Sequence, residues 1–267
     1  MIYACMSWYR ESPTWLTYTV ASAARFCDHL IAVDGAYALY PDRPRGSSGA
    51  DEHEAIARAC NAAGIGFTLH VPSGPWLRNE VGKRQAMTEL FVQLGRPGDW
   101  CFVIDADEVV IEAPPKDRLL AQLAESEHPV GLISFGQRHD HYEWQPLDGS
   151  DVAPEDRQWP EDRILYTVDG VDFTRSRTRR LFRWDPTLRV EGVHYGYRIT
   201  DEHGQDVELW QLPGAAAAED VSNLLVEHRH KFRLPNRREM GESYYARREA
   251  AKIETLAPLR RPARGDG

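Results

Sequence analysis

Short apolar runs, separated by Gly, Pro and charged residues, recur through the first part of the chain. Four of them have the length and composition of buried β-strands: residues 2–6, 29–33, 66–71 and 101–104. Three intervening segments have apolar residues at helical spacing: residues 13–26, 51–63 and 79–94. Pro13 suits the first turn of its helix, Asp51 is expected to cap the second helix, and Gly64 is expected to end it. The alternation predicts an α/β fold with a mostly parallel central sheet, flanked by helices and joined by right-handed crossovers.

The pattern becomes less regular after Pro114 and Pro115. The further elements predicted are a helix at 116–127, a strand at 130–135, strand-like hairpins around 175–184 and 188–199, a linker or short helix at 215–218, a strand at 224–230 and a final basic helix. Residues 136–163 are polar and irregular, and loops of that length are usually functional or disordered. We therefore expect one continuous domain with two halves, residues 1–114 and residues 115–267.

The composition is that of a soluble globular protein. At 267 residues the chain fits one large domain, and no apolar run approaches the roughly 20 residues that a membrane span needs. The first residues lack a basic leader followed by a long apolar segment, so no secretion signal is expected. The scattered cysteines favour small core residues in a reducing, cytoplasmic compartment: Cys5, Cys27, Cys60 and Cys101. The sequence makes no prediction of the oligomeric state.

The charge is unevenly distributed. The net charge is −9, yet residues 231–267 hold ten Lys and Arg against five Asp and Glu. The acidic main body argues against a reader of duplex DNA, which needs a basic surface. The basic tail fits either a solvated helical face or a contact with an acidic acceptor or nucleic acid.

The run Asp105-Ala-Asp107-Glu108 directly follows the strand predicted at residues 101–104. In open α/β sheets, ligands bind outside the carboxyl ends of the strands. Three acidic groups within four residues repel one another unless a cation neutralises them. Carboxylate oxygens are ligands that Mg²⁺ and Mn²⁺ prefer, and Mg²⁺ usually completes its shell with phosphates and water. This run predicts a metal site for a phosphorylated substrate; the alternative is a plain acidic turn that ends the strand.

Other polar residues extend this candidate site. Asp34 ends the second predicted strand and could accept hydrogen bonds from a nucleoside, or form an Asp-Gly turn. Lys83 and Arg84 lie near a helix start, where cations oppose the helix dipole unless an anion binds beside them; the alternative is a surface cluster. Three arginines stand at every second position of a predicted strand, so their side chains would project from one face: Arg175, Arg177 and Arg179. They could bind a diphosphate or an acidic acceptor, or form salt bridges on the surface.

Histidines offer a further metal ligand. The pairs His139/His141 and His228/His230 each have a spacing that places both rings on one face of a strand, although a lone His-x-His pair is weak evidence for zinc. A single histidine that joins Asp107 on a divalent ion is easier to accept. His194 and His228 are the candidates, because each closes a strand-like run.

Six segments carry a family resemblance through their order along most of the chain. They are Ser7-Trp-Tyr-Arg-Glu-Ser12, Val33-Asp34-Gly35, Lys83-Arg84, Trp100-Cys-Phe-Val-Ile-Asp-Ala-Asp-Glu108, Arg180-Leu-Phe-Arg183 with Gly192-Val-His194, and Val226-Glu-His228 before a Tyr- and Arg-rich segment. In this order they resemble glycosyltransferases of the GT-A fold, in particular the large inverting family 2 and its bacterial relatives. The resemblance implies a Rossmann-like sheet, with a nucleotide-sugar-binding half at 1–114 and an acceptor-side half at 115–267 that has a β-hairpin region and a terminal helix.

The resemblance also implies roles for individual residues. It assigns nucleotide-sugar binding to Ser7, Arg10, Glu11, Asp34, Lys83, Arg84 and Asp105, with Asp34 on the nucleoside and Asp105 near the ribose. It assigns to Asp107 the binding of the Mn²⁺ or Mg²⁺ ion that contacts the diphosphate. Asp105 and either His194 or His228 would be further ligands of this ion. It assigns the carboxylate base of an inverting transfer to Glu161 and Asp162, with Asp140 behind them.

The expected activity is metal-dependent transfer of a sugar from a nucleotide-diphosphate sugar to a protein, glycan, small-molecule or modified nucleic-acid acceptor. A nucleotidyltransferase shares the acidic metal site, but residues 7–12 lack the glycines of its usual signature loop. A non-catalytic nucleotide-sugar-binding module would need neither metal nor base. A hydrolase of the phosphatase type is disfavoured, because its nucleophilic Asp would follow the first strand.

Overall fold

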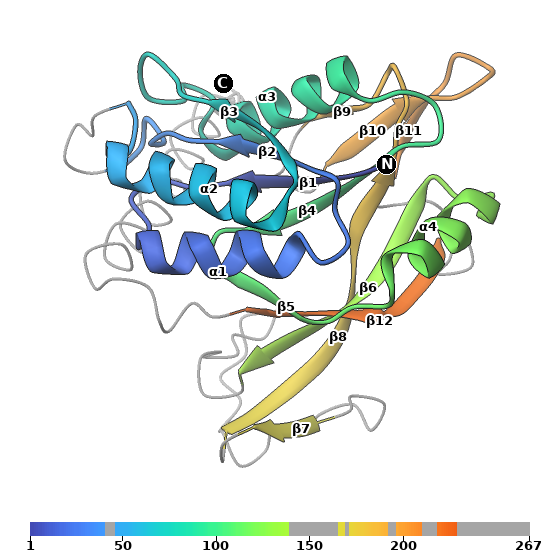
Figure 1. Ribbon diagram of the computed structural model, residues 1–267. Coiled ribbons are helices and arrows are strands. Elements are labelled where there is room, and N and C mark those ends of the chain that lie inside the picture. Colours follow the sequence, from blue (N-terminus) through green and yellow to red (C-terminus); the bar gives the residue numbers. More distant parts are fainter. Residues whose placement is uncertain (41–45, 139–164, 169–170, 192–195, 210–217, 229–267) are drawn as a thin grey trace, which may run out of the picture.

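The computed structural model describes residues 1–40, 46–138, 165–168, 171–191, 196–209 and 218–228 (Figure 1). In chain order the elements are β1 (Ile2–Ser7), α1 (Pro13–Ala23), β2 (His29–Val33), α2 (Ala50–Ala63), β3 (Gly66–His70), α3 (Asn79–Leu94), β4 (Trp100–Asp105), β5 (Glu108–Glu112), α4 (Lys116–Glu125), β6 (Val130–Arg138), β7 (Leu165–Val168), β8 (Val171–Arg183), β9 (Arg189–Val190), β10 (Tyr197–Thr200), β11 (Asp206–Glu208) and β12 (Glu219–His228). The fold is mixed α/β, as the alternation of apolar runs predicts.

One nine-stranded sheet runs through the molecule in the order β3-β2-β1-β4-β8-β6-β12-β5, with β7 paired to β8 beside this path. The strands β3, β2, β1 and β4 are parallel, which confirms the prediction for the first part of the chain. The chain moves outward from β1 to β2 and β3 and then returns to β4 on the other side of β1. The sheet therefore changes its winding direction between β1 and β4, where open α/β sheets bind their ligands.

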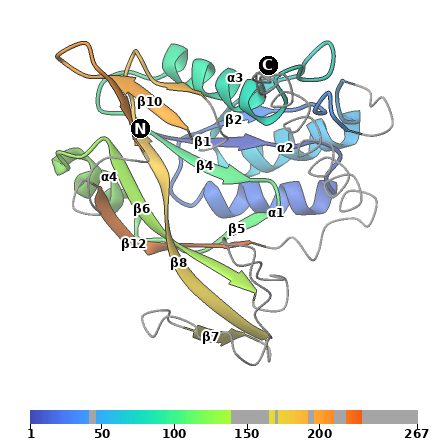
Figure 2. The ribbon, with the colours of Figure 1, turned by 180° about the vertical axis from the view of Figure 1, so that it is seen from behind.

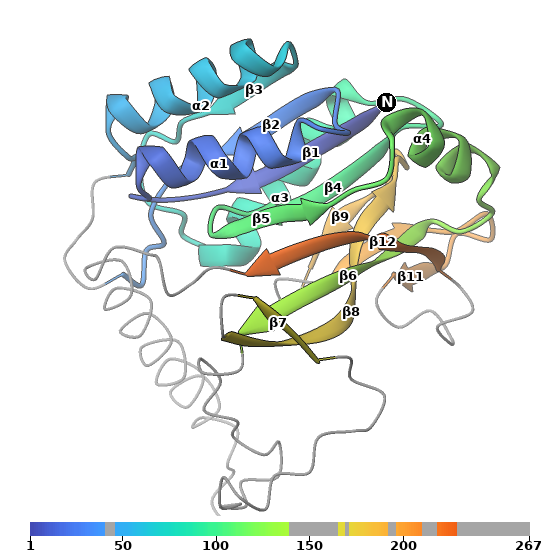
Figure 3. The ribbon, with the colours of Figure 1, turned by 60° about the horizontal axis from the view of Figure 1, so that its bottom comes forward.

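Helices cover both faces of this sheet (Figures 1 and 3). On one face, α1, α2 and α4 bury residues such as Leu16, Ile56 and Leu119 against the strands. On the opposite face, α3 buries Met87 and Phe91 together with residues of the small sheet β11-β10-β9 (Figure 2). This two-sided burial explains why the first strands are apolar throughout rather than alternating.

The second half of the sequence inserts into the same sheet, which corrects two expectations. The segment 175–184, expected in a hairpin, belongs to β8, which pairs antiparallel with β7 but also lies between β4 and β6, antiparallel to both. The sequence predicted no strand between Asp107 and Pro114, yet residues 108–112 form β5, which pairs antiparallel with β12. β5 was not recognised in the sequence because glutamates stand at both of its ends. Glu108 and Val110 nevertheless both point into the interior, with 1% and 2% of their surfaces exposed.

The start of α2 corrects a third expectation. Its N-cap is Gly49 rather than Asp51, and the Gly49 N–H donates to the Glu52 carboxylate at 2.7 Å. The end of the helix agrees with the prediction: Gly64 has a φ of 68°, a left-handed conformation that a residue without Cβ adopts at low cost. All four cysteines are buried free thiols, as predicted.

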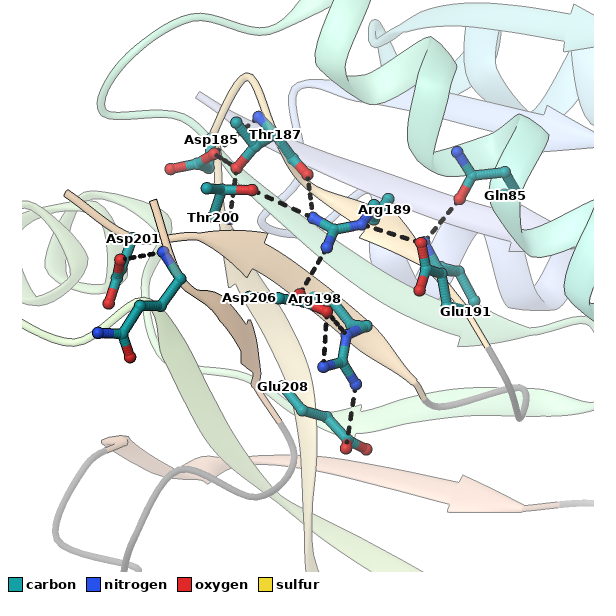
Figure 4. A network of polar contacts seen from close by, with 12 residues as sticks. Gln85, Asp185, Thr187, Arg189, Glu191, Arg198, Thr200, Asp201, Asp206 and Glu208 are labelled. Carbon is teal, nitrogen blue, oxygen red and sulfur yellow. Dashed lines mark hydrogen bonds and ion pairs between the residues drawn. The ribbon is translucent and has the colours of Figure 1, made fainter. Parts of the chain in front are cut away.

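The small sheet is fastened to itself by ion pairs and to α3 by a hydrogen bond (Figure 4). Arg189 and Arg198 both contact Asp206, at 2.5 and 2.8 Å. The backbone N–H of Val190 donates to the Gln85 side chain of α3 at 2.6 Å. The strands β9 and β10, expected in a hairpin, pair antiparallel, and β9 is held to α3 at Gln85, which directly follows the candidate residues Lys83 and Arg84.

Asp28 links the start of the sheet to α4 and yields a stability prediction. Its carboxylate accepts the Ile2 N–H at 2.8 Å and contacts Lys116 Nζ at 2.6 Å. Burial alone would raise the pKa of Asp28, but the hydrogen bonds from Lys116 and Ile2 outweigh it and lower the pKa. A carboxylate with a lowered folded-state pKa adds stability above its unfolded pKa and loses it as pH falls through the folded pKa.

We therefore expect Asp28→Asn to lower the free energy of unfolding by about 1 kcal/mol at pH 7. The difference from wild type should shrink as the pH falls from about 5 to about 3. Urea unfolding at several pH values measures both effects, with the exposed Asp117→Asn as the matched control. A difference that grows in acid would contradict this role of Asp28.

Candidate functional site

Three parallel strands bring candidate residues to the same edge of the sheet. Ser7, at the end of β1, pairs in register with Val33 of β2 and with Asp105 of β4. Asp34 directly follows Val33, and Asp107 lies in the turn between β4 and β5. The register of the strands therefore places these residues together at the carboxyl ends of the strands, as the sequence predicts.

Two buried guanidinium groups contact the Asp105 carboxylate. Arg84 of α3 donates from Nη2 to Oδ1 at 3.0 Å, and Arg180 of β8 lies 3.7 Å from Oδ2. Both arginine side chains are 4% exposed, whereas Asp105 is 25% exposed. Asp105 thus has its charge balanced from inside the protein while one side of it faces solvent.

Arg180 reaches this position because of a β-bulge. Gly131 of β6 pairs with Leu181, and the next residue, Leu132, pairs with Arg179. Arg180 is therefore an extra residue in β8, and bulges of this kind redirect a side chain next to functional sites. Its guanidinium lies over the Phe135 ring, 5.3 Å from the ring centre, and donates from Nη2 to Glu108 Oε1 at 2.6 Å.

Glu108 is the buried anion beneath the site. Its second oxygen accepts the Asp105 N–H at 2.8 Å, so its carboxylate holds the end of β4 as well as Arg180. Burial raises the pKa of Glu108; the charge of Arg180 lowers it and that of Asp105 raises it. We call Asp105, Glu108, Arg84 and Arg180 the rim cluster.

Asp107 and His228 form a second pair beside the rim cluster. His228 Nε2 lies 2.9 Å from Asp107 Oδ2, and the side chains are 27% and 4% exposed. The pair exists because β12 runs antiparallel to β5, which places His228 opposite Glu108. Of the two histidines considered from the sequence, His228 is the one that the structure brings to Asp107; His194 lies outside the described residues.

The donor atoms fit a divalent cation only in part. Asp107 offers carboxylate oxygen and His228 an imidazole nitrogen, whereas the oxygens of Asp105 face arginines. Within the described ranges, no three His, Cys, Asp or Glu side chains form a ready metal-binding group. Such a two-residue set suits Mn²⁺ or Mg²⁺ that takes its other ligands from substrate phosphates and water.

Asp34 is enclosed by protein donors. Its side chain is fully buried and accepts hydrogen bonds from Ser48 N and Oγ at 2.6 and 2.7 Å and from Gly35 N at 2.6 Å. His53 Nε2 lies 2.9 Å from Asp34 Oδ2, the oxygen that also accepts the Ser48 N–H. Ser48 Oγ also accepts the Arg10 N–H at 2.9 Å, so it joins the loops after β1 and β2. Sequence analysis missed Ser48 and His53, because nothing in their spacing relates them to Asp34.

Lys83 fastens the same two loops from the side of α3. It is 2% exposed, and its ammonium group donates to the carbonyl oxygens of Trp8 and of Gly35, the latter at 2.9 Å. The positive charges expected to attract an anion at the start of α3 thus meet protein groups: carbonyls at Lys83, and Glu80 and Asp105 at Arg84. Of the other candidates near these loops, Glu11 is buried and Arg10 is exposed.

Several sequence candidates lie outside the described residues, namely Asp140, Glu161, Asp162, His139, His141 and His230. In the alternating arginine row, Arg177 contacts Asp220 at 2.6 Å on the surface, with half of its side chain exposed. For Arg177 the structure therefore gives the salt-bridge alternative.

No protein-family model and no curated protein matches this chain. Among the helices that the structure describes, none is both long and apolar enough to span a bilayer.

Proposed function

We propose that the protein is a metal-dependent glycosyltransferase of the GT-A type, which transfers a sugar from a nucleotide-diphosphate sugar to an acceptor. The observation that carries the proposal is the Asp107–His228 pair, next to Asp105, at the carboxyl ends of parallel strands. This is the edge where the winding of the sheet reverses, between β1 and β4. The strand order and the resemblance of the segments support the same conclusion.

The residues of the candidate site would have different roles in such a reaction. Asp107 and His228 would hold Mn²⁺ or Mg²⁺, which as a Lewis acid stabilises the departing nucleoside diphosphate. Arg84 and Arg180 hold Asp105 at the rim, where its exposed side can accept hydrogen bonds from the ribose. Lys83 and Ser48 fix the loops that follow β1 and β2, and so shape the nucleoside side of the site.

The acceptor proton needs a base. Glu161 or Asp162, with Asp140 as the next candidate, would take it as the acceptor oxygen attacks the anomeric carbon. A single displacement of this kind inverts the configuration of the sugar. The acceptor is a protein, glycan, small molecule or modified nucleic acid.

A ligand screen tests the donor class. Thermal unfolding with UDP-, GDP- and TDP-sugars, each with and without Mn²⁺, should find one donor that stabilises the protein by about 2.7 kcal/mol at a hundredfold excess over its dissociation constant. The stabilisation should require the metal. If every donor leaves the unfolding temperature unchanged in Mn²⁺, the proposal is wrong.

Product analysis separates the competing functions. Incubation with the stabilising donor should release a nucleoside diphosphate, in small amounts even without acceptor. Release of pyrophosphate from a nucleoside triphosphate and a sugar phosphate would favour the nucleotidyltransferase. Metal-independent binding without any turnover would favour a non-catalytic module.

A further inference from the structure

The outer edge of β3 has hydrogen-bonding groups directed away from the sheet. Within the described chain, β3 pairs only with β2. Gly66 N donates to Asp28 O at 3.1 Å and His70 O accepts from Asp34 N at 3.0 Å, so these residues face inward. Because alternate residues of a strand face opposite neighbours, the backbone groups of Phe67, Leu69 and Val71 face outward.

This edge lacks the usual protection against pairing. Exposed edge strands generally carry charged residues, proline or a bulge. Residues 66–71 contain no Lys, Arg, Asp or Glu, and the nearest proline, Pro72, comes after them. Phe67 and Val71 are instead large apolar residues with 37% and 45% of their surfaces exposed. The outer edge of β3 is therefore suited to pairing with another strand.

We propose that β3 pairs antiparallel with β3 of a second copy of this chain, about a two-fold axis through Leu69. Phe67 and Val71, the residue directly after β3, lie two positions before and after Leu69, so the alternation of an extended chain places them on the same face. The axis would place Phe67 opposite the partner's Val71, and the reverse, so that each exposed apolar side chain covers the other. The outward N–H and C=O groups of all three residues would be satisfied.

The charges of α2 are self-complementary about the same axis. Leu69 packs into the core that contains Ile56 of α2, so α2 lies on the face that carries Phe67 and Val71. Glu54 and Arg58 of α2 form an exposed ion pair at 3.0 Å.

The middle of α2 and Leu69 of β3 lie at the same height along the direction of the strand. Strands rise about 3.3 Å per residue and helices about 1.5 Å, so counting back from the turn between α2 and β3 puts Leu69 level with roughly residues 56–57 of α2. Glu54 would then lie level with the partner's Arg58, so opposite charges meet where two identical helices approach. A partner with a different charge pattern would lack this match, which favours a second copy.

The proposed interface is separated from the rim cluster, because β2 and β1 lie between β3 and β4, the nearest strand that contributes to the cluster. The inference goes beyond the proposed function and does not depend on it. Variants at Phe67, which pairs in register with Leu30 at the other end of β2 from Asp34, therefore test the interface without touching the rim cluster.

The first test is the mass in solution. Light scattering coupled to gel filtration should give twice the 30.4 kDa of the chain. Phe67→Lys should raise the dissociation constant of the dimer about tenfold or more, because the charge must be buried against apolar side chains. Leu77→Lys is the matched control, since Leu77 is 87% exposed and lies outside β3. A monomeric wild type, or a Phe67→Lys variant as dimeric as the control, would overturn the proposal.

The second test fixes the register. The double variant Phe67→Cys/Val71→Cys should form disulfide-linked dimers with oxidised glutathione, because opposed residues in a strand pair meet disulfide geometry. The native cysteines are buried and do not compete. Each single variant should stay uncrosslinked, because the same residue in the two copies would lie about 13 Å apart. Crosslinking of the single variants to the same extent would exclude this axis.

Discussion

Replacing Asp107 with alanine is expected to lower kcat/KM for sugar transfer at least about a hundredfold, because the cation loses its carboxylate ligand. The same change should remove the Mn²⁺-dependent stabilisation by the donor. Asp107 lies in the turn between β4 and β5 and contacts His228, so the fold should be retained. Steady-state kinetics over a range of Mn²⁺ concentrations, with far-UV circular dichroism, measures both effects.

Controls make this result specific. Asp117→Ala removes an exposed carboxylate from the first turn of α4 and should leave kcat/KM and its Mn²⁺ dependence unchanged. His228→Ala should raise the Mn²⁺ concentration needed for half-maximal rate. Full Mn²⁺-dependent activity in the Asp107→Ala variant would rule out the proposed mechanism.

Replacing Arg180 with methionine is expected to lower the free energy of unfolding by about 3–5 kcal/mol, because the Glu108 carboxylate stays buried without its principal cation. Glu108 is 2% exposed, and Arg180 contacts it at 2.6 Å. Burial raises the pKa of Glu108, so its charged form costs stability at neutral pH and protonation relieves that cost. The deficit should therefore be larger at about pH 8 than at about pH 5.

The double variant Arg180→Met/Glu108→Gln provides the internal control. Glutamine keeps an oxygen for the Asp105 N–H but carries no charge, so most of the lost stability should return. Urea unfolding of the two single variants and the double variant gives the coupling energy. Equal losses in Arg180→Met and the double variant would mean that packing over Phe135, not charge, determines the role of Arg180.

Local sequence signals were sufficient for the parallel part of the fold. The limits of β2 and α3 agree with the prediction to the residue, β1 is one residue longer at its end, and β4 is one residue longer at each end. Each of these elements has an apolar run of the right period between clear breaking residues. The prediction that Asp34 and Asp105 directly follow the carboxyl ends of two strands comes from the same signals.

Contacts between distant segments could not be predicted in this way. Arg180 reaches Glu108 only because a bulge turns it inward, and a bulge depends on the partner strand rather than on the local sequence. Ser48 and His53 reach Asp34 through the fold of the loop before α2. The pairing of His228 with Asp107 requires β12 beside β5, which no periodicity reports.

The place of β8 between β4 and β6 has a consequence for synthesis on the ribosome. One edge of β4, with its apolar Trp100 and Phe102, gains its neighbour only after β8 has been translated. At about 5–20 residues per second, the nascent chain carries that open edge for on the order of ten seconds. Shielding by a chaperone during this interval would guard against aggregation, and any fragment that stops before β8 would carry the hazard permanently.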